Sequence, residues 1–334
     1  MIVGLSAGEL TPSEAEFLRS ARPAGLIIFT RNAQSPVQLE RLVGEARNAI
    51  GEDDCLVLVD QEGGRVQRLQ PPHWRSLPPA ASFAGRLAQD PDGARRAAEL
   101  VAGLTAHDLR RVGINTNCVP CADRPVSGAH DIIGTRAYGG DTKVISELAR
   151  IVAAAHMAGG VVPIVKHVPG HGRARVDSHL ALPVVDTDAD ELSHTDFVPF
   201  RNLSDLPAAM TAHVVFSRID DSAPATTSPT VVSDIIRSEI GFDGLLISDD
   251  ISMQALRGPI DTRSKDALIA GCDVVLHCNG ELAEMEAIAA AVPAMSGAAM
   301  RRFEACVAIT RNAPYPLDFA EAEAALAAHM SFVA

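Results

Sequence analysis

The sequence predicts an α/β fold built as a single (β/α)8 TIM-like barrel. Short, continuously apolar runs recur along the 334 residues, and segments with helical periodicity separate them. Continuous apolar runs are typical of parallel strands buried on both faces, and strands that alternate with helices indicate a parallel sheet. The chain has no fixed-period repeat, low-complexity tract or obvious linker. Its length therefore fits one barrel better than two smaller domains.

Seven of the apolar runs are predicted as strands, at residues 25–30, 56–60, 113–117, 161–167, 208–214, 244–249 and 272–277. Helical patterns lie between them, for example at residues 36–50, 92–112, 142–157, 228–239 and 262–269. Pro36 and Pro229 stand near two of the helix starts, where the missing amide hydrogen of proline costs little.

Polar residues gather at the C-terminal ends of these runs. They are Asp60, Asn117, Lys166, His167, His213, Asp249 and His277. Barrel enzymes build their active sites at this face. Any strand that reaches the surface needs a polar end, but this accounts poorly for so many charged and imidazole groups. The pattern indicates an active site at the C-terminal face of the barrel.

Composition limits the possible partners and the compartment. The net charge of -13 makes the chain a poor nucleic-acid binder, and no apolar stretch has the length of a membrane span. The N-terminal residues lack the pattern of a secretory signal, and six cysteines are too few for a disulfide framework. We expect a cytoplasmic monomer with reduced thiols that acts on a small molecule.

The segment 166–179, KHVPGHGRARVDSH, holds three of the eleven histidines and is predicted to form an irregular loop after a strand. Asp177 and His179 are close enough for the carboxylate to fix the imidazole tautomer, so that His179 acts as a general acid and base. A capping Asp beside an exposed His is the simpler alternative. Zinc binding by His167, His171 and His179 is another, although Lys166 would repel the cation.

Two further segments place charged groups at strand ends. In LLISDDISM, residues 245–253, strand alternation puts Asp249 on the face of Leu245, so that one carboxylate faces the barrel mouth as nucleophile or electrostatic stabiliser, while Asp250 is a candidate helix cap. In VDQEGGRVQRL, residues 59–69, Asp60 ends a strand, and Arg68 follows Arg65 at the spacing of one helical turn. These groups suit sugar hydroxyls or, alternatively, a salt-bridged loop.

The ordered motifs VDQEGGRVQRL, KHVPGHG followed by DSH, and GFDGLLISDDISM resemble glycoside hydrolase family 3. GLIIFTRN, IIGTRAYG at residues 132–139 and AGCDVVLHCN fit the same pattern, so the similarity covers about residues 25–279. The chain is most similar to the bacterial single-domain β-N-acetylglucosaminidases of peptidoglycan recycling. Val168, where many relatives have Phe, and the segment 172–176 depart from the family pattern and could alter loop motion.

This resemblance implies a single catalytic barrel domain over residues 1–334 and a retaining mechanism without a metal or cofactor. It implies Asp249 as nucleophile and His179, oriented by Asp177 on a mobile loop, as acid/base. The implied substrate is N-acetylglucosamine β-1,4-linked to 1,6-anhydro-N-acetylmuramic acid, with or without peptide. The implied sugar-binding residues are Asp60, Arg68, Arg136, Lys166 and His167.

Two other functions remain open from the sequence. A phosphorylase on the same scaffold would use phosphate in place of water. A non-catalytic amino-sugar sensor would bind without turnover, but one Trp and two Tyr offer few rings for stacking on a sugar.

Overall fold

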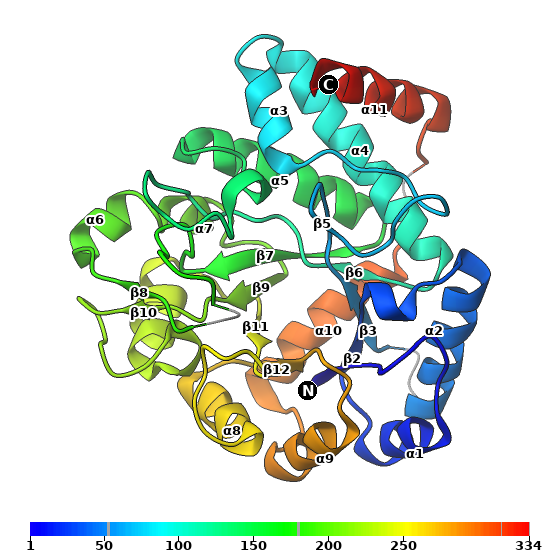
Figure 1. The fold of residues 1–334 in the computed structure, drawn as a ribbon, viewed down its shortest axis with the longest axis vertical. Coiled ribbons are helices and arrows are strands. Elements are labelled where there is room, and N and C mark those ends of the chain that lie inside the picture. Colours follow the sequence, from blue (N-terminus) through cyan, green and yellow to red (C-terminus); the bar gives the residue numbers. More distant parts are fainter. Residues whose placement is uncertain (52–53, 179–180, 315, 334) are drawn as a thin grey trace.

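The computed structural model describes residues 1–51, 54–178, 181–314 and 316–333. Eight parallel strands close into a barrel, as the sequence predicts (Figure 1). In order around the barrel they are β1 (Ile2–Gly4), β12 (Val274–His277), β11 (Leu245–Asp250), β9 (Ala208–Thr211), β7 (Val162–Val168), β6 (Thr116–Asn117), β3 (Leu56–Val59) and β2 (Gly25–Ile28). The first strand, β1, was not predicted, because three residues are too few to show a pattern.

Helices surround the barrel (Figure 1). They are α1 (Pro12–Ala21), α2 (Pro36–Ile50), α3 (Ala80–Leu87), α4 (Pro91–Arg111), α5 (Thr142–Ala158), α6 (Ala189–His194), α7 (Val198–Asn202), α8 (Ile260–Ala270), α9 (Leu282–Ala291), α10 (Gly297–Arg311) and α11 (Phe319–Val333). A π-helical segment, Val231–Glu239, occupies the predicted helix at 228–239. Three short 3-10 turns, Thr30–Asn32, Gly134–Arg136 and Ala225–Thr227, and two small sheets, β4 (Gln61–Gly63) with β5 (Val66–Gln67) and β8 (Val184–Val185) with β10 (Val215–Phe216), lie in the loops.

The helix boundaries follow from local side-chain chemistry. Ser35 accepts a hydrogen bond from the backbone of Gln38 at the start of α2, and Gly51 ends that helix with a φ of 74°. Thr11 and Glu14 form a reciprocal capping box at the start of α1. Such caps satisfy backbone groups that a helix leaves without partners at its ends.

The N-terminal end of the barrel is closed by α10, which crosses behind the strands (Figure 1). Cys306 and Val307 of α10 belong to the apolar cluster inside the barrel, together with Leu245 and Val274. The Cys306 thiol donates to the carbonyl of Pro207, at the start of β9. Because side chains fill the N-terminal end of the barrel, a ligand-binding site is expected at the C-terminal end.

None of the described helices is both long and apolar enough to cross a membrane.

Candidate active site

A cavity of about 480 Å³ opens at the C-terminal ends of the strands. The structure brings six of the residues predicted from the sequence together in its lining: Asp60, Arg68, Arg136, Lys166, His167 and Asp249. They come from the ends of β3, β7 and β11, from the hairpin after β3 and from the turn at Gly134–Arg136. Side chains from segments far apart in the sequence therefore converge on one space, while their individual roles stay predictions.

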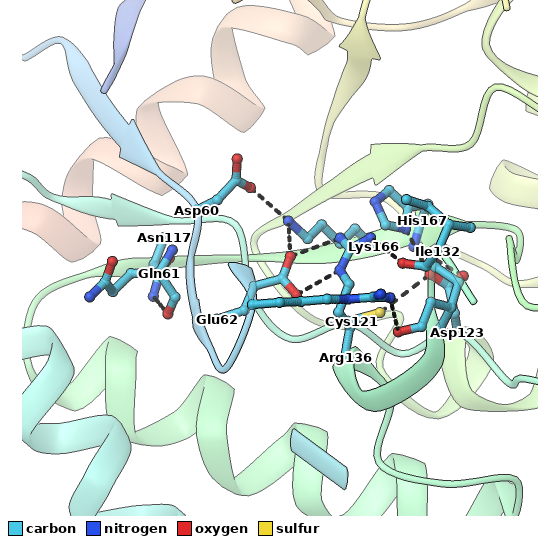
Figure 2. Close-up of polar contacts among 12 residues, drawn as sticks. Asp60, Gln61, Glu62, Asn117, Cys121, Asp123, Ile132, Arg136, Lys166 and His167 are labelled. Atoms are coloured by element: carbon cyan, nitrogen blue, oxygen red, sulfur yellow. Dashed lines mark hydrogen bonds and ion pairs between the residues drawn. The ribbon is translucent and has the colours of Figure 1, made fainter. Parts of the chain in front are cut away.

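A chain of alternating charges forms one side of this cavity (Figure 2). The Lys166 ammonium lies 2.8 Å from an oxygen of Asp60 and 2.7 Å from an oxygen of Glu62. Arg68 extends the chain at one end, with Nη2 3.1 Å from Asp60. Arg136 extends it at the other, donating to both oxygens of Glu62 over 2.9 and 2.8 Å. Each buried charge thus has a partner of opposite sign.

This pairing keeps the carboxylates ionised although they are buried. Burial alone would raise the pKa of Asp60, but Lys166 and Arg68 hold it well below its usual range. Burial would also raise the pKa of Glu62, but Lys166 and Arg136 lower it to about 2. Burial would lower the pKa of Lys166, and the two carboxylates raise it instead. The result is a fixed polar surface that can hydrogen-bond sugar hydroxyls without reorganising.

The segment after Asp60 forms a hairpin, so the predicted helical turn through Arg65 and Arg68 is wrong. β4 and β5 pair antiparallel, and the Gln61 side chain accepts hydrogen bonds from the backbone of Arg68 and Leu69. Gly63 has a φ of 100°, and a β-carbon there would lie 2.3 Å from the carbonyl of Pro78. Gly64, with a φ of 57°, completes the turn, and the hairpin brings Arg68 back against Asp60.

The two carboxylates that end β11 both line the cavity, contrary to the prediction that only one would face the mouth. The pairing of β11 with β12 shifts register between Ile247 and Asp250, which breaks the alternation of side chains. Burial would raise the pKa of Asp249, but His213, His167 and its other polar neighbours lower it. Asp249 is therefore a half-buried carboxylate held in the ionised form that a nucleophile requires.

Asp250 is occupied by a turn and does not cap a helix. One oxygen accepts from the backbone of Ser252 over 3.0 Å and of Cys278 over 3.2 Å, and the other accepts from the Ser252 hydroxyl over 2.7 Å. The next helix, α8, begins only at Ile260. These contacts suit a structural role for Asp250 beside Asp249.

A closed set of hydrogen bonds holds the backbone of this pair. The Asp249 amide donates to the Thr211 hydroxyl, which lies 2.8 Å from the Thr226 hydroxyl. Thr226 lies 2.7 Å from Nδ1 of His213, whose Nε2 donates to the carbonyl of Asp250 over 2.9 Å. Because a carbonyl oxygen only accepts, Nε2 of His213 carries a hydrogen. The network fixes the strand end that presents Asp249.

The predicted acid/base pair is only partly described. His179 lies outside the described residues, so its role stays a prediction, and the alternative of a zinc site that includes it is not tested. Asp177 is half-buried and is not among the described residues that line the cavity, whereas its neighbour Ser178 is.

The first half of the loop that leads to Asp177 is anchored to its surroundings. Arg173 donates to Asp196 over 2.8 Å and pairs with Glu191 at the same distance. The carbonyl of Ala174 accepts a hydrogen bond from the backbone of His130 over 2.8 Å. The segment that departs from the family pattern therefore contains an ion-pair anchor of its own.

The sequence analysis did not single out Asp123, which is fully buried next to His167. Its carboxylate lies 2.7 Å from Nδ1 of His167 and also accepts a weak hydrogen bond from the Cys121 thiol. The ligand atoms of Cys121, Asp123 and His167 lie within 4.8 Å of one another, the spacing that a metal ion would need. Here they already form direct hydrogen bonds, with the cations Lys166 and Arg136 nearby.

Comparison with known proteins identifies the family. The model described as "Glycosyl hydrolase family 3 N terminal domain" matches residues 4–311. The chain belongs to glycosyl hydrolase family 3. It is 38% identical over 275 residues to a β-hexosaminidase of Methylobacillus flagellatus, covering 81% of this chain and 78% of the relative. It is 39% identical over 274 residues to a β-hexosaminidase of Methylococcus capsulatus, covering 81% and 80%.

Solved structures support the assignment of the chain to this glycosyl hydrolase family. The structure of NagZ from Neisseria gonorrhoeae in complex with N-trifluoroacetyl-D-glucosamine superposes with a TM-score of 0.86 at 30% identity, covering 100% of this chain and 98% of that one. The β-N-acetylhexosaminidase of Beutenbergia cavernae superposes with a TM-score of 0.77 at 29% identity, covering 99% and 96%.

Glu62 and Asp123 are the two residues of this glycoside hydrolase that sequence reasoning missed. Glu62 stands next to Asp60 but inside a hairpin, where alternation says little about direction. Asp123 follows a two-residue strand, and no periodic pattern marks it. The only feature of the sequence that could have indicated Glu62 and Asp123 is that each is an acidic residue soon after a strand.

Proposed function

We propose that this family 3 glycoside hydrolase is a retaining β-N-acetylhexosaminidase that removes terminal N-acetylglucosamine in cell-wall recycling in the cytoplasm. The observation that carries the proposal is the placement of Asp249, an ionised carboxylate on a braced strand end, in the same cavity as five side chains suited to sugar hydroxyls. The names of the relatives, β-hexosaminidase and β-N-acetylhexosaminidase, support the same activity.

In this mechanism Asp249 attacks the anomeric carbon and forms a covalent glycosyl-enzyme. His179, oriented by Asp177, protonates the departing oxygen and then removes a proton from the water that releases the sugar. Two displacements retain the anomeric configuration. Retaining enzymes generally use two carboxyl groups, and here a histidine–aspartate pair takes the place of one of them.

We propose that Asp60, Lys166, His167, Arg68 and Arg136 bind the hydroxyls of the terminal N-acetylglucosamine, the sugar that is transferred to Asp249. Charged groups give strong, directional hydrogen bonds, and a carboxylate beside two cations offers both acceptors and donors. Because each group is already paired, binding requires little reorganisation of the cavity.

The proposed substrate is N-acetylglucosamine β-1,4-linked to 1,6-anhydro-N-acetylmuramic acid, with or without its peptide. The lactyl group of that substrate carries a free carboxylate when no peptide is attached, and the peptide carries carboxylates when it is. Arg31, which donates to the backbone carbonyls of Leu5 and Cys278, also lines the cavity, as does Arg65, which pairs with Asp131. Guanidinium groups suit such anions. The arginines thus favour an acidic leaving group over a neutral oligosaccharide.

Trapping of the intermediate tests the proposed function. The protein is incubated with a 5-fluoro N-acetylglucosaminyl fluoride, digested, and mapped by peptide mass spectrometry. A label on Asp249 is expected, and the Asp249→Asn variant should take up none. A label on Asp250, or no label on active protein, would refute the assignment. A rate that depends on phosphate, with a sugar 1-phosphate as product, would indicate a phosphorylase instead.

A second measurement tests the substrate. The disaccharide N-acetylglucosaminyl-1,6-anhydro-N-acetylmuramic acid, its lactyl methyl ester and chitobiose are compared by kcat/KM. The free acid should be the best of the three. Equal values for the acid and the ester would contradict recognition of the lactyl carboxylate.

A further inference from the structure

Asp123 joins two parts of the active site that the sequence separates, the end of β7 and the start of the loop that leads to Asp177. Figure 2 shows Asp123 beside His167, at the end of β7. It is fully buried and is not among the described residues that line the cavity. One oxygen lies 2.7 Å from Nδ1 of His167, and the other accepts from the backbone amide of His171 over 2.6 Å. Both oxygens lie 3.3 Å from the amide of His167.

These contacts determine which nitrogen of His167 carries hydrogen. Burial would raise the pKa of Asp123, but His167 and the hydrogen bonds hold it well below its usual range, so the carboxylate is ionised and only accepts. Nδ1 of His167 must then be a donor, whether the ring is neutral or cationic. In a neutral ring Nε2, on the opposite edge, is left as an acceptor. His167 lines the cavity, so Nε2 is the nitrogen available to a sugar hydroxyl.

The same carboxylate holds the start of the loop. His171 is buried, its amide is bound by Asp123, and its Nε2 lies 3.1 Å from the hydroxyl of Ser178. Ser178 is the residue after Asp177. Burial lowers the pKa of His171 to about 4, so this ring stays neutral and keeps its contact near neutral pH. The carboxylate of Asp123 thereby connects the sugar-binding His167 with the segment that carries Asp177.

We propose that Asp123 is a positioning residue of the glycosidase, which fixes His167 with Nε2 as a hydrogen-bond acceptor toward the sugar and anchors the loop that presents the acid/base pair. The inference deepens the proposed function and rests on it. Asp123 does not touch the substrate and acts through His167 and His171.

An isosteric substitution separates this role from simple packing. In Asp123→Asn, one of the two oxygens becomes an amide donor. If the amide faces His167, the ring must turn to the opposite tautomer and lose its acceptor at Nε2. If the amide faces the backbone of His171, it meets another donor and the loop loses its anchor. Either orientation breaks one of the two connections, although the shape is unchanged.

A double-mutant cycle tests the proposal on hydrolysis of an aryl N-acetylglucosaminide. Asp123→Asn should lower kcat/KM about 100-fold, the size expected when a reacting partner is misplaced. In a His167→Gln background the same change should cause a loss in kcat/KM that is smaller by a factor of at least about ten. The effects of two residues in direct contact are not independent. Asp196→Asn is the matched control, a buried carboxylate that anchors the loop through Arg173 without touching His167. Its effects should add to those of His167→Gln. Equal losses for Asp123→Asn in both backgrounds would overturn the proposal.

The tautomer can be measured in the unmutated protein, which avoids dependence on a variant that folds poorly. Protein labelled with ¹⁵N-histidine is recorded by long-range ¹H–¹⁵N correlation, and the His167 signals are assigned by their loss in His167→Gln. A protonated Nδ1 is expected. An unprotonated Nδ1 would overturn the proposal even in a fully active enzyme. Conversely, a protonated Nδ1 in a protein that hydrolyses no N-acetylglucosaminide would refute the proposed function and leave the hydrogen-bond assignment intact.

Discussion

Arg136 donates two hydrogen bonds to Glu62, from Nε to Oε2 over 2.9 Å and from Nη2 to Oε1 over 2.8 Å. The exposed fraction of the side chain is only 9% for Arg136 and 6% for Glu62. Oε1 of Glu62 also lies 2.7 Å from the Lys166 ammonium. Glu62 thus holds two cations of the cavity in place, although it is not among the described residues that line the cavity.

Glu62→Gln should destabilise the protein and weaken substrate binding together. The substitution removes the negative charge that Arg136 and Lys166 share, and the new amide group directs a hydrogen-bond donor toward one of these two cations. Breaking a buried pair in this way costs about 3 kcal/mol in the free energy of unfolding. We expect a lower urea midpoint and a rise in KM for an aryl N-acetylglucosaminide of about tenfold, as both cations shift.

Glu147→Gln provides the comparison on the surface. Glu147 pairs with Arg95, and both side chains are well exposed. Such a pair contributes less than about 1 kcal/mol, so the midpoint and KM should stay close to those of the parent. Equal effects of the two substitutions would contradict the role given to Glu62.

Asp249→Asn and Asp250→Asn should differ in kind. Loss of the proposed nucleophile at Asp249 should lower kcat by about 10⁴-fold or more, with a fold of unchanged stability. Asp250→Asn can keep an acceptor oxygen for the amides of Ser252 and Cys278 and donate from its own amide to the Ser252 hydroxyl, so it should lower the unfolding free energy by less than about 1 kcal/mol and reduce kcat less. Steady-state kinetics and urea unfolding of both variants check this. The reverse ranking of kcat would exchange the two assignments.

Arg173→Gln should loosen the loop that leads to Asp177. The change removes the ion pairs with Asp196 and Glu191, which hold the segment to the end of α6. Hydrogen–deuterium exchange followed by mass spectrometry should show faster exchange in peptides that contain residues 171–178. Arg218→Gln, which removes an exposed pair with Asp186, should leave that exchange as it is. Unaltered exchange in Arg173→Gln would show that the anchor is dispensable.

His156 makes the stability of the barrel depend on pH. Its Nδ1 donates to the carbonyl of Val152 over 2.8 Å, and its Nε2 accepts from the Asn117 amide over 3.0 Å. Burial lowers its pKa to about 4, from 6.5 in the unfolded chain. Between these values the unfolded state binds more protons, so stability falls as pH drops from about 6.5 to 4, by up to about 1.4 kcal/mol per unit.

Urea unfolding at pH 7, 6 and 5 measures this slope. His156→Gln should reduce it, although the variant is less stable at pH 7. His171, whose pKa is also lowered to about 4, leaves a remaining slope of the same sign. A slope in His156→Gln equal to that of the parent would show that His156 is not the titrating group.

Most of the fold could be predicted from short stretches of consecutive residues. Strands buried on both faces must be apolar throughout, so seven of the eight barrel strands could be predicted as short apolar runs. Helix α2 begins and ends at the predicted residues, because Ser35, Pro36 and Gly51 mark its ends. The strand-end positions of Asp60, Lys166 and Asp249 followed from the same pattern, because parallel strands bring their C-terminal ends to one face. Their specific roles came from the family motifs.

The tertiary structure alone decided what surrounds these groups. The register shift in β11 turned both Asp249 and Asp250 toward the cavity, since pairing with β12 overrides simple alternation. Glu62 meets Arg136 across 74 positions, and Asp123 meets His167 across 44. A hydrogen bond between residues so far apart depends on where the closed barrel places each strand end. The sequence by itself therefore determined the fold and the charged groups at its mouth, and only the packed barrel decided which of them hold the others in place.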